Sequence, residues 1–283
     1  MELKEFRKLF EKNETIQSLL KHTNIAGEKF HLRGLIGSSR TIFAAALSEK
    51  RSLPVVYILN DKEEAGYFYD DLINLQTGSP VAFFPASYKR PLQFDQPEQE
   101  NIILRTEVLS QLQQQIPVSI VTYPEALAEK VITSETLTSN SFRINKGDQL
   151  SIEFLNEVLF EYGFERVDFV AEAGKYSIRG TIVDVFSFSG EDPCRIDFFG
   201  DRIDTIRIFS IADQISVAQT DQIVIIPNIQ SGFNEEKRDN FLNFLPETST
   251  IFIQDTRLTS DLIDRLSTQT AVTGEDLPEK VIT

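Results

Sequence analysis

The chain has 283 residues, of which 41% are hydrophobic and 25% charged, a composition typical of a globular protein with one large or two ordinary domains. Its 28 Lys and Arg are outnumbered by 43 Asp and Glu, which gives a formal net charge of −15. Because nucleic-acid affinity comes largely from phosphate neutralisation by basic side chains, this balance argues against a general DNA-binding protein, although it leaves room for a local basic patch. Protein partners fit the charge better.

Cysteine content and hydropathy point to the cytoplasm. Cys194 is the only cysteine, which excludes an internal disulfide and cysteine-based zinc sites. The beginning, MELKEFRKLFEK, has no apolar core like that of a signal peptide, and no apolar run approaches the ~20 residues of a membrane span. The two histidines, His22 and His31, lie outside any metal-ligand spacing, so we expect neither a metal nor a cofactor.

The first part of the chain alternates between helical and strand patterns. Helices are predicted at residues 3–21 (one or two), 41–50, 61–75 with Asn60 or Asp61 as cap, 98–115, and from Pro124. Strands are predicted at residues 31–37, 54–59, 81–84 and 117–122. Strands that alternate with helices of this length indicate βαβ units, and therefore an α/β fold with a parallel sheet.

The pattern changes near Thr133, where a stretch rich in Ser, Thr and Asn suggests a domain boundary. A helix at 151–162 and a β-rich region follow; the α/β pattern then returns with helices at 235–244 and 260–267 around a strand at 249–253. We therefore expect an α/β domain in two halves, residues 1–138 and 228–283, interrupted by a β-rich α+β module at 139–227. The ending, GEDLPEKVIT, has no closing element, so we expect the second half to be truncated.

The β-rich region centres on residues 174–209, where three runs of strand-forming residues are separated by SGEDP and by Gly200-Asp201. A three-stranded antiparallel meander is the direct prediction. Alternation in CRIDFF places Cys194, Ile196 and Phe198 on one face, and Arg195, Asp197 and Phe199 on the other. The second face is either an open protein-binding surface, since Arg and aromatic residues commonly anchor interfaces, or part of a sheet packed on both sides with Phe199 in the core.

A glycine-containing segment resembles a phosphate-binding loop but departs from its consensus. Residues 34–41, GLIGSSRT, match the consensus at Gly34 and Thr41 and contain a further glycine, Gly37, whereas Ser39 and Arg40 replace the second Gly and the Lys. Arg is bulkier than Lys and is not an equivalent phosphate ligand. The later strand is followed by Gln254-Asp255, where a helicase-type ATPase requires Asp-Glu. These departures predict a degenerate, inactive nucleotide fold, and no catalytic residues are expected.

Residues 164–216, FERVDFVAEAGKYSIRGTIVDVFSFSGEDPCRIDFFGDRIDTIRIFSIADQIS, resemble the module shared by the repair helicase UvrB and the transcription-repair coupling factor Mfd, and the resemblance extends over essentially the whole chain. Two departures favour the N-terminal UvrB-homology region of Mfd. The chain has Ser39 and Arg40 where UvrB-type proteins keep an intact loop. Only PASYKRPLQFDQPEQEN separates a strand from the next helix, which leaves no room for the DNA-gripping hairpin of UvrB.

The resemblance implies a UvrA-binding module set in a degenerate RecA-like ATPase domain. Two arginines and a phenylalanine central to UvrA contact in the family align with Arg179, Arg195 and Phe199. In the family, RNA polymerase and DNA are bound by parts of the parent protein that this chain lacks. Two alternatives stay open: a UvrB-like ATP-dependent, DNA-damage-binding helicase subunit, and a structural spacer in a larger motor.

Overall fold

The computed structural model describes residues 29–48, 51–76, 78–87, 99–189, 192–229 and 237–272, together with residues 14, 17, 18 and 27. Most of the predicted 3–21 helices therefore lies outside the described residues. No helix in the described part of the chain is both long and apolar enough to cross a membrane. Two compact units are formed: unit 1 comprises Met1–Gln96, Gln111–Lys130 and Asn240–Thr283, and unit 2 comprises Pro97–Ser110 and Val131–Asp239.

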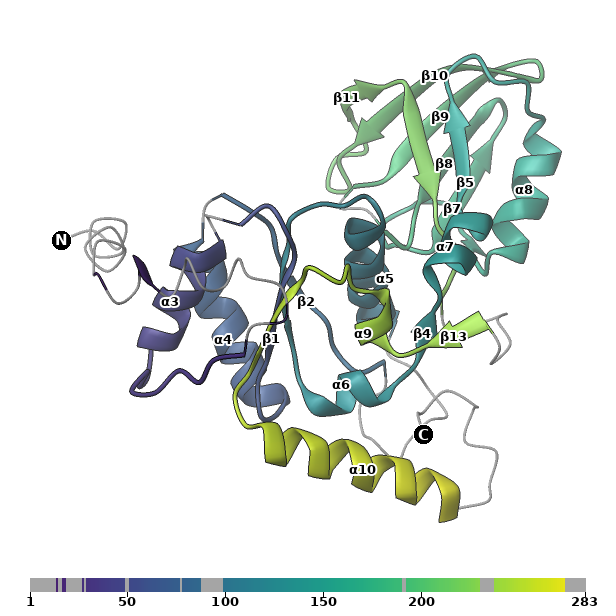
Figure 1. Cartoon of the computed structure of the whole chain (residues 1–283). Helices are drawn as coiled ribbons and strands as arrows, with labels where there is room; N and C mark the ends of the chain where they lie inside the picture. Colours follow the sequence, from purple (N-terminus) through teal and green to yellow (C-terminus); the bar gives the residue numbers. More distant parts are fainter. Residues whose placement is uncertain are drawn as a thin grey trace. The chain divides into compact units, whose positions relative to one another are not determined.

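Unit 1 is built on a parallel sheet in the order β14-β1-β3-β2, and this confirms the predicted α/β fold (Figure 1). Its strands are β1 (Val55–Ile58), β2 (Val81–Phe83), β3 (Ser119–Thr122) and β14 (Thr250–Ile253). Its helices are α3 (Ser39–Ser48), α4 (Lys62–Leu75), α6 (Pro124–Ala128), α9 (Phe241–Phe244) and α10 (Thr256–Val272). All four residues of β1 and of β3 are buried, as expected for the central strands of a parallel sheet.

Local signals place several helix ends correctly. Asp61 caps α4, because its side chain accepts a hydrogen bond from the backbone N–H of Glu64 at 2.8 Å. Pro124 opens α6 at a position where its missing N–H costs nothing.

Two predicted elements differ from the structure. Residues 31–36 form no strand, because their backbone pairs with no other strand of the described chain. The helix expected at 235–244 is only partly testable, since residues 235 and 236 lie outside the described residues; in the remainder, β13 (Arg238–Asp239) precedes the short helix α9. The Ser/Thr-rich stretch after Thr133 begins with helix α7 (Ser134–Asn140), which Thr133 caps by accepting from the Thr136 N–H.

Unit 2 contains a six-stranded sheet in the order β11-β10-β9-β8-β7-β6. The strands are β6 (Glu165–Arg166), β7 (Lys175–Arg179), β8 (Ile182–Phe186), β9 (Cys194–Phe199), β10 (Arg202–Phe209) and β11 (Ser216–Thr220). The short pairs β4 (Val131–Ile132) with β13 and β5 (Phe142–Asn145) with β12 (Gln222–Ile225) complete its strands. Helix α8 (Ile152–Glu161) belongs to the same unit, and the residues of α5 (Gln99–Gln113) are divided between the two.

The predicted three-stranded meander is wrong in one respect. Its first run is itself a hairpin, β7 and β8, which turns at Gly180 with φ of 61°. The turn at Gly200 is confirmed, with φ of 59°, a left-handed conformation that glycine adopts without a Cβ clash. The central sheet is therefore a four-stranded antiparallel meander extended at both edges.

The two faces of this sheet differ in chemistry. Val183, Ile196 and Phe198 lie on one face and are buried. Helix α8 covers this face with Leu155 and Leu159, both fully buried, and its Asn156 accepts a hydrogen bond from the Tyr176 hydroxyl of β7 at 3.0 Å. The opposite face carries the charged residues.

Candidate partner-binding surface

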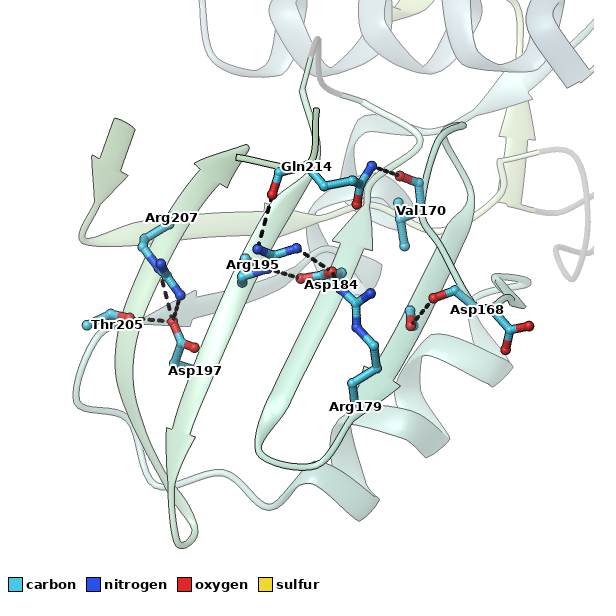
Figure 2. A network of polar contacts seen from close by, with 10 residues as sticks. Asp168, Val170, Arg179, Asp184, Arg195, Asp197, Thr205, Arg207 and Gln214 are labelled. Carbon is cyan, nitrogen blue, oxygen red and sulfur yellow. Dashed lines mark hydrogen bonds and ion pairs between the residues drawn. The ribbon is translucent and has the colours of Figure 1, made fainter. Parts of the chain in front are cut away.

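A band of charged side chains runs across β7 to β10 on the sheet face opposite α8. Pairing between strands sets Asp184 directly across from Arg195, and Arg195 across from Arg207 (Figure 2). Asp197 lies two residues further along β9 and faces Thr205. Because residues at alternate positions share a face, the register of four strands brings these groups together.

Asp184 is the centre of the band. Its side chain is only 1% exposed, and it binds Arg195 in a two-pronged pair, with Nε to Oδ1 at 2.7 Å and Nη2 to Oδ2 at 2.9 Å. Arg179 forms a second ion pair with Oδ2 of the same carboxylate. The hydrogen bond to Asp184 raises the pKa of Arg195 above its ordinary value, which outweighs the opposing effect of burial. The buried carboxylate of Asp184 on β8 thus binds one arginine from each flanking strand, Arg179 from β7 and Arg195 from β9.

Arg195 is largely occupied by contacts within the chain. Its Nη1 donates to the backbone oxygen of Gln214 at 3.3 Å, and its guanidinium carbon lies 4.7 Å from the centre of the Phe209 ring. The side chain is 15% exposed. Alternation predicts the face of Arg195 correctly, but the guanidinium is turned towards its neighbours rather than fully towards solvent.

Arg179 is the more accessible arginine. Its side chain is 40% exposed at the end of β7, and its guanidinium carbon lies 5.4 Å from the centre of the Phe169 ring. Phe169 is itself 67% exposed. The two form an open cation–π pair, in which the ring orients the cation without covering it.

Phe199 is 82% exposed, which decides between the two alternatives left open by the sequence: its ring lies outside the core. It borders a pocket of about 400 Å³ that is also lined by Lys146, Arg202, Asp204 and Asp221. Arg and aromatic side chains are common anchors of protein interfaces, so this part of the sheet face is the candidate partner-binding surface.

Asp197 anchors a second, more solvent-exposed cluster on the same face. Its Oδ2 accepts from Arg207 Nη2 at 2.7 Å and from the Thr205 hydroxyl at 2.6 Å. The side chains of Asp197 and Arg207 are 23% and 33% exposed, respectively. Along β9, Asp197 and then Phe199 continue this face from Arg195 towards the β9–β10 turn.

Three residues of this surface were not predicted from the sequence: Asp184, Phe169 and Gln214. Asp184 had a usable signal, since it is the one charged residue in a strand of otherwise apolar side chains. Phe169 lies outside any periodic element. Gln214 adopts a left-handed φ of 61°, and its side-chain amide donates to the carbonyls of Val170 and Ile211 at 3.2 and 3.0 Å. No local pattern predicts the contact with Val170, because it joins segments 44 residues apart in the chain.

The Gly34–Thr41 segment lacks the structural context of a phosphate-binding loop. Gly34 and Gly37 have left-handed φ values of 84° and 56°, and Ser39, Arg40 and Thr41 form the first turn of α3. No strand precedes the segment within the described chain, although the motif requires one. Asp255, the acid after β14, caps α10 by accepting from the N–H groups of Arg257 and Leu258, both at 3.0 Å. In the described residues, no group of three or more His, Cys, Asp or Glu could hold a metal ion.

Cys194 should be chemically inert in the folded protein. Burial, helped by the nearby Asp192 carboxylate, raises the pKa of its thiol from 9.0 to about 11. Because the thiolate is the reactive form, we expect iodoacetamide to modify Cys194 at pH 8 about 100-fold more slowly than in the urea-unfolded chain. The folded rate should keep rising with pH up to about 11. Mass spectrometry reports this one site without ambiguity, and equal rates in both states would contradict the assignment.

Comparison with known proteins assigns the module. Residues 142–230, which include strands β5 to β12, match the family described as the UvrB interaction domain. The match therefore covers the β-rich module and leaves the parallel-sheet unit outside it.

About seven tenths of the chain is similar in sequence to transcription-repair-coupling factors. It is 30% identical to that of Bacillus subtilis over 196 residues, 69% of this chain and 17% of the relative. It is 29% identical to that of Escherichia coli over 202 residues, 71% of this chain and 18% of the relative. UvrABC system protein B of Thermosipho africanus is 24% identical over 223 residues, 73% of this chain and 33% of that protein. The chain thus spans less than a fifth of the length of these coupling factors.

Proposed function

We propose that this chain is a protein-interaction module that recruits the repair protein UvrA. The observation that carries the proposal is the open face of a UvrB interaction domain on which Phe199 and Arg179 project into solvent, 82% and 40% exposed. Arg179, Arg195 and Phe199 are here called the docking residues. The same three positions align with the UvrA-contacting residues of the family that the sequence resembles.

Each docking residue has a separate task. Phe199 enters an apolar pocket of UvrA and acts as the central anchor. Arg179 makes a charge-assisted hydrogen bond to a UvrA carboxylate, for which its exposure and its orientation on Phe169 prepare it. Arg195 acts mainly through Asp184, because its bidentate pair fixes the carboxylate that holds Arg179.

The biological role follows from the parent protein. The module links RNA polymerase stalled at DNA damage to nucleotide excision repair in the cytoplasm, and the polymerase-binding and translocating parts lie in portions of the parent that this chain does not include. Residues 1–138 and 228–283 form the two halves of a degenerate ATPase-like domain, and residues 139–227 form the inserted UvrA-binding module. This chain has no ATPase activity of its own; the parent is the translocase.

A nucleotide titration separates this proposal from the UvrB-like alternative. We expect no saturable binding of a fluorescent ATP analogue with Mg²⁺, because Arg40 replaces the phosphate-binding Lys and Asp255 caps a helix. An intact UvrB protein serves as the positive control. Saturable binding that disappears in a Thr41→Ala variant would favour the ATPase alternative.

UvrA binding by the isolated chain tests the proposal directly. Biolayer interferometry with immobilised chain and purified UvrA should show saturable, salt-sensitive binding, since charged residues form the docking face. Absence of binding by the folded chain would refute the proposal and would favour a purely structural role.

A further inference from the structure

The outer face of α8 has a composition that the fold does not require. With 3.6 residues per turn, Glu153, Phe154, Glu157, Phe160 and Glu161 fall within a stripe about 120° wide, with the three glutamates between the two phenylalanines. We call these five residues the acidic–aromatic stripe. Leu155 and Leu159 occupy the opposite side of the helix and are fully buried. The stripe is therefore the side of α8 that faces away from the sheet.

The stripe is accessible. Phe160 is 75% and Phe154 48% exposed, and all three glutamates are exposed. Phe154 forms an edge-to-face contact with the ring of Phe142, with 6.1 Å between the ring centres. Large apolar side chains are not needed on the outer face of an amphipathic helix, so two on one stripe indicate a contact surface.

The charges on the stripe repel one another along the helix, and only Glu153, in the first turn, is favoured by the helix dipole. Glu153, Glu157 and Glu161 are spaced four residues apart, so successive carboxylates repel each other along the helix. Glu161 also sits at the C-terminal end, where the helix dipole disfavours an anion. None of the three forms an ion pair with a residue in the described part of the chain. A basic partner would relieve this repulsion.

We propose that the acidic–aromatic stripe docks a basic amphipathic helix of a partner protein. Lys or Arg side chains of that helix pair with the three glutamates, while its apolar side chains cover Phe154 and Phe160. Charge complementarity selects this occupant, because anionic lipids and nucleic acids are repelled by the same carboxylates.

The stripe and the docking residues lie on opposite sides of one sheet. Helix α8 packs against the face that contains Val183, Ile196 and Phe198, whereas Arg179 belongs to the other face. The two surfaces can therefore be occupied at the same time, and the stripe does not depend on the proposed UvrA contact.

A peptide titration tests the proposal. The probe is a fluorescein-labelled, 18-residue amphipathic helix made of Leu and Lys, followed by fluorescence anisotropy with the whole chain. We expect Glu157→Lys/Phe160→Ser to weaken binding at least tenfold. The matched control is Asp70→Lys/Tyr67→Ser on the outer face of α4, where Tyr67 is also 75% exposed. It changes the net charge equally and should alter affinity less than twofold. Equal losses in both variants, or no binding by the unaltered chain, would overturn the proposal.

Thermal unfolding provides a second readout. Glu157→Lys alone converts the repulsion of residue 157 with Glu153 and with Glu161 into attraction. It should therefore raise the melting temperature by roughly 1 to 2 °C while weakening peptide binding. UvrA binding should be unchanged. If the melting temperature falls instead, the loss of peptide affinity is explained by damage to α8, and the proposal is contradicted.

Discussion

Replacing Phe199 by Ala is expected to weaken UvrA binding about 30-fold or more, because truncating a central aromatic anchor commonly costs ~2 kcal/mol of binding free energy. The ring is 82% exposed, so its removal takes little from the fold. The double variant Arg195→Ala/Phe199→Ala should bind more weakly still. Biolayer interferometry at fixed salt measures both affinities.

The matched control for this prediction is Phe160→Ala. It removes the same ring from a position that is 75% exposed on α8, on the far side of the sheet. Its UvrA affinity should stay within twofold of the original. If Phe199→Ala binds UvrA as tightly as the unaltered chain, or if Phe160→Ala loses as much, the docking residues are wrongly placed.

The arginine contribution needs a separate variant. Arg195→Ala removes the bidentate partner of the buried Asp184 carboxylate. Its effect on UvrA affinity therefore combines the loss of any direct contact by Arg195 with a disturbance of Asp184. Arg179→Ala deletes the half-exposed arginine and leaves the Arg195–Asp184 pair in place. A loss of UvrA affinity in Arg179→Ala without a change in urea stability would assign that contact to docking.

Replacing Asp184 by Asn is expected to lower the free energy of unfolding of unit 2 by about 3 kcal/mol, since removal of one member of a buried ion pair strands its partner charge. The effect should lie at the lower end of the usual range, because Arg179 reaches solvent and the amide oxygen still accepts a hydrogen bond. The urea midpoint should fall by roughly 1 to 3 M.

Cys194 gives this measurement its specificity. It lies in β9, next to Arg195, and its thiol becomes reactive when this sheet opens. Pulsed alkylation at increasing urea therefore follows unit 2 and not the parallel sheet of unit 1. This separation matters, because a chain with two compact units does not give one well-defined unfolding free energy.

Asp197→Asn is the control for Asp184→Asn. The substitution is the same and the residue lies on the same face, but Asp197 and Arg207 are 23% and 33% exposed. Its cost should stay below about 1 kcal/mol, because water screens the pair. Equal costs for the two variants would contradict the central role of Asp184.

The sequence by itself determined the features that depend on local chemistry. Strands that alternate with helices along the chain predicted the parallel sheet of unit 1. Asp61 and Pro124 marked helix starts through hydrogen-bonding and dihedral preferences that act within one turn. Alternation along β9 placed Arg195 and Phe199 on one face, since side chains of a strand alternate whatever lies around them.

Only the tertiary structure decided how those side chains are used. Arg195 and Phe199 share a face, yet one is 15% exposed in its side chain and the other 82% as a residue. The difference comes from Asp184, which pairing of β8 with β9 sets opposite Arg195, and from the backbone of Gln214 in a left-handed turn. Cross-strand register and turn conformation bring together segments that are distant in the chain. The residue pattern within one strand therefore cannot predict the contacts between them.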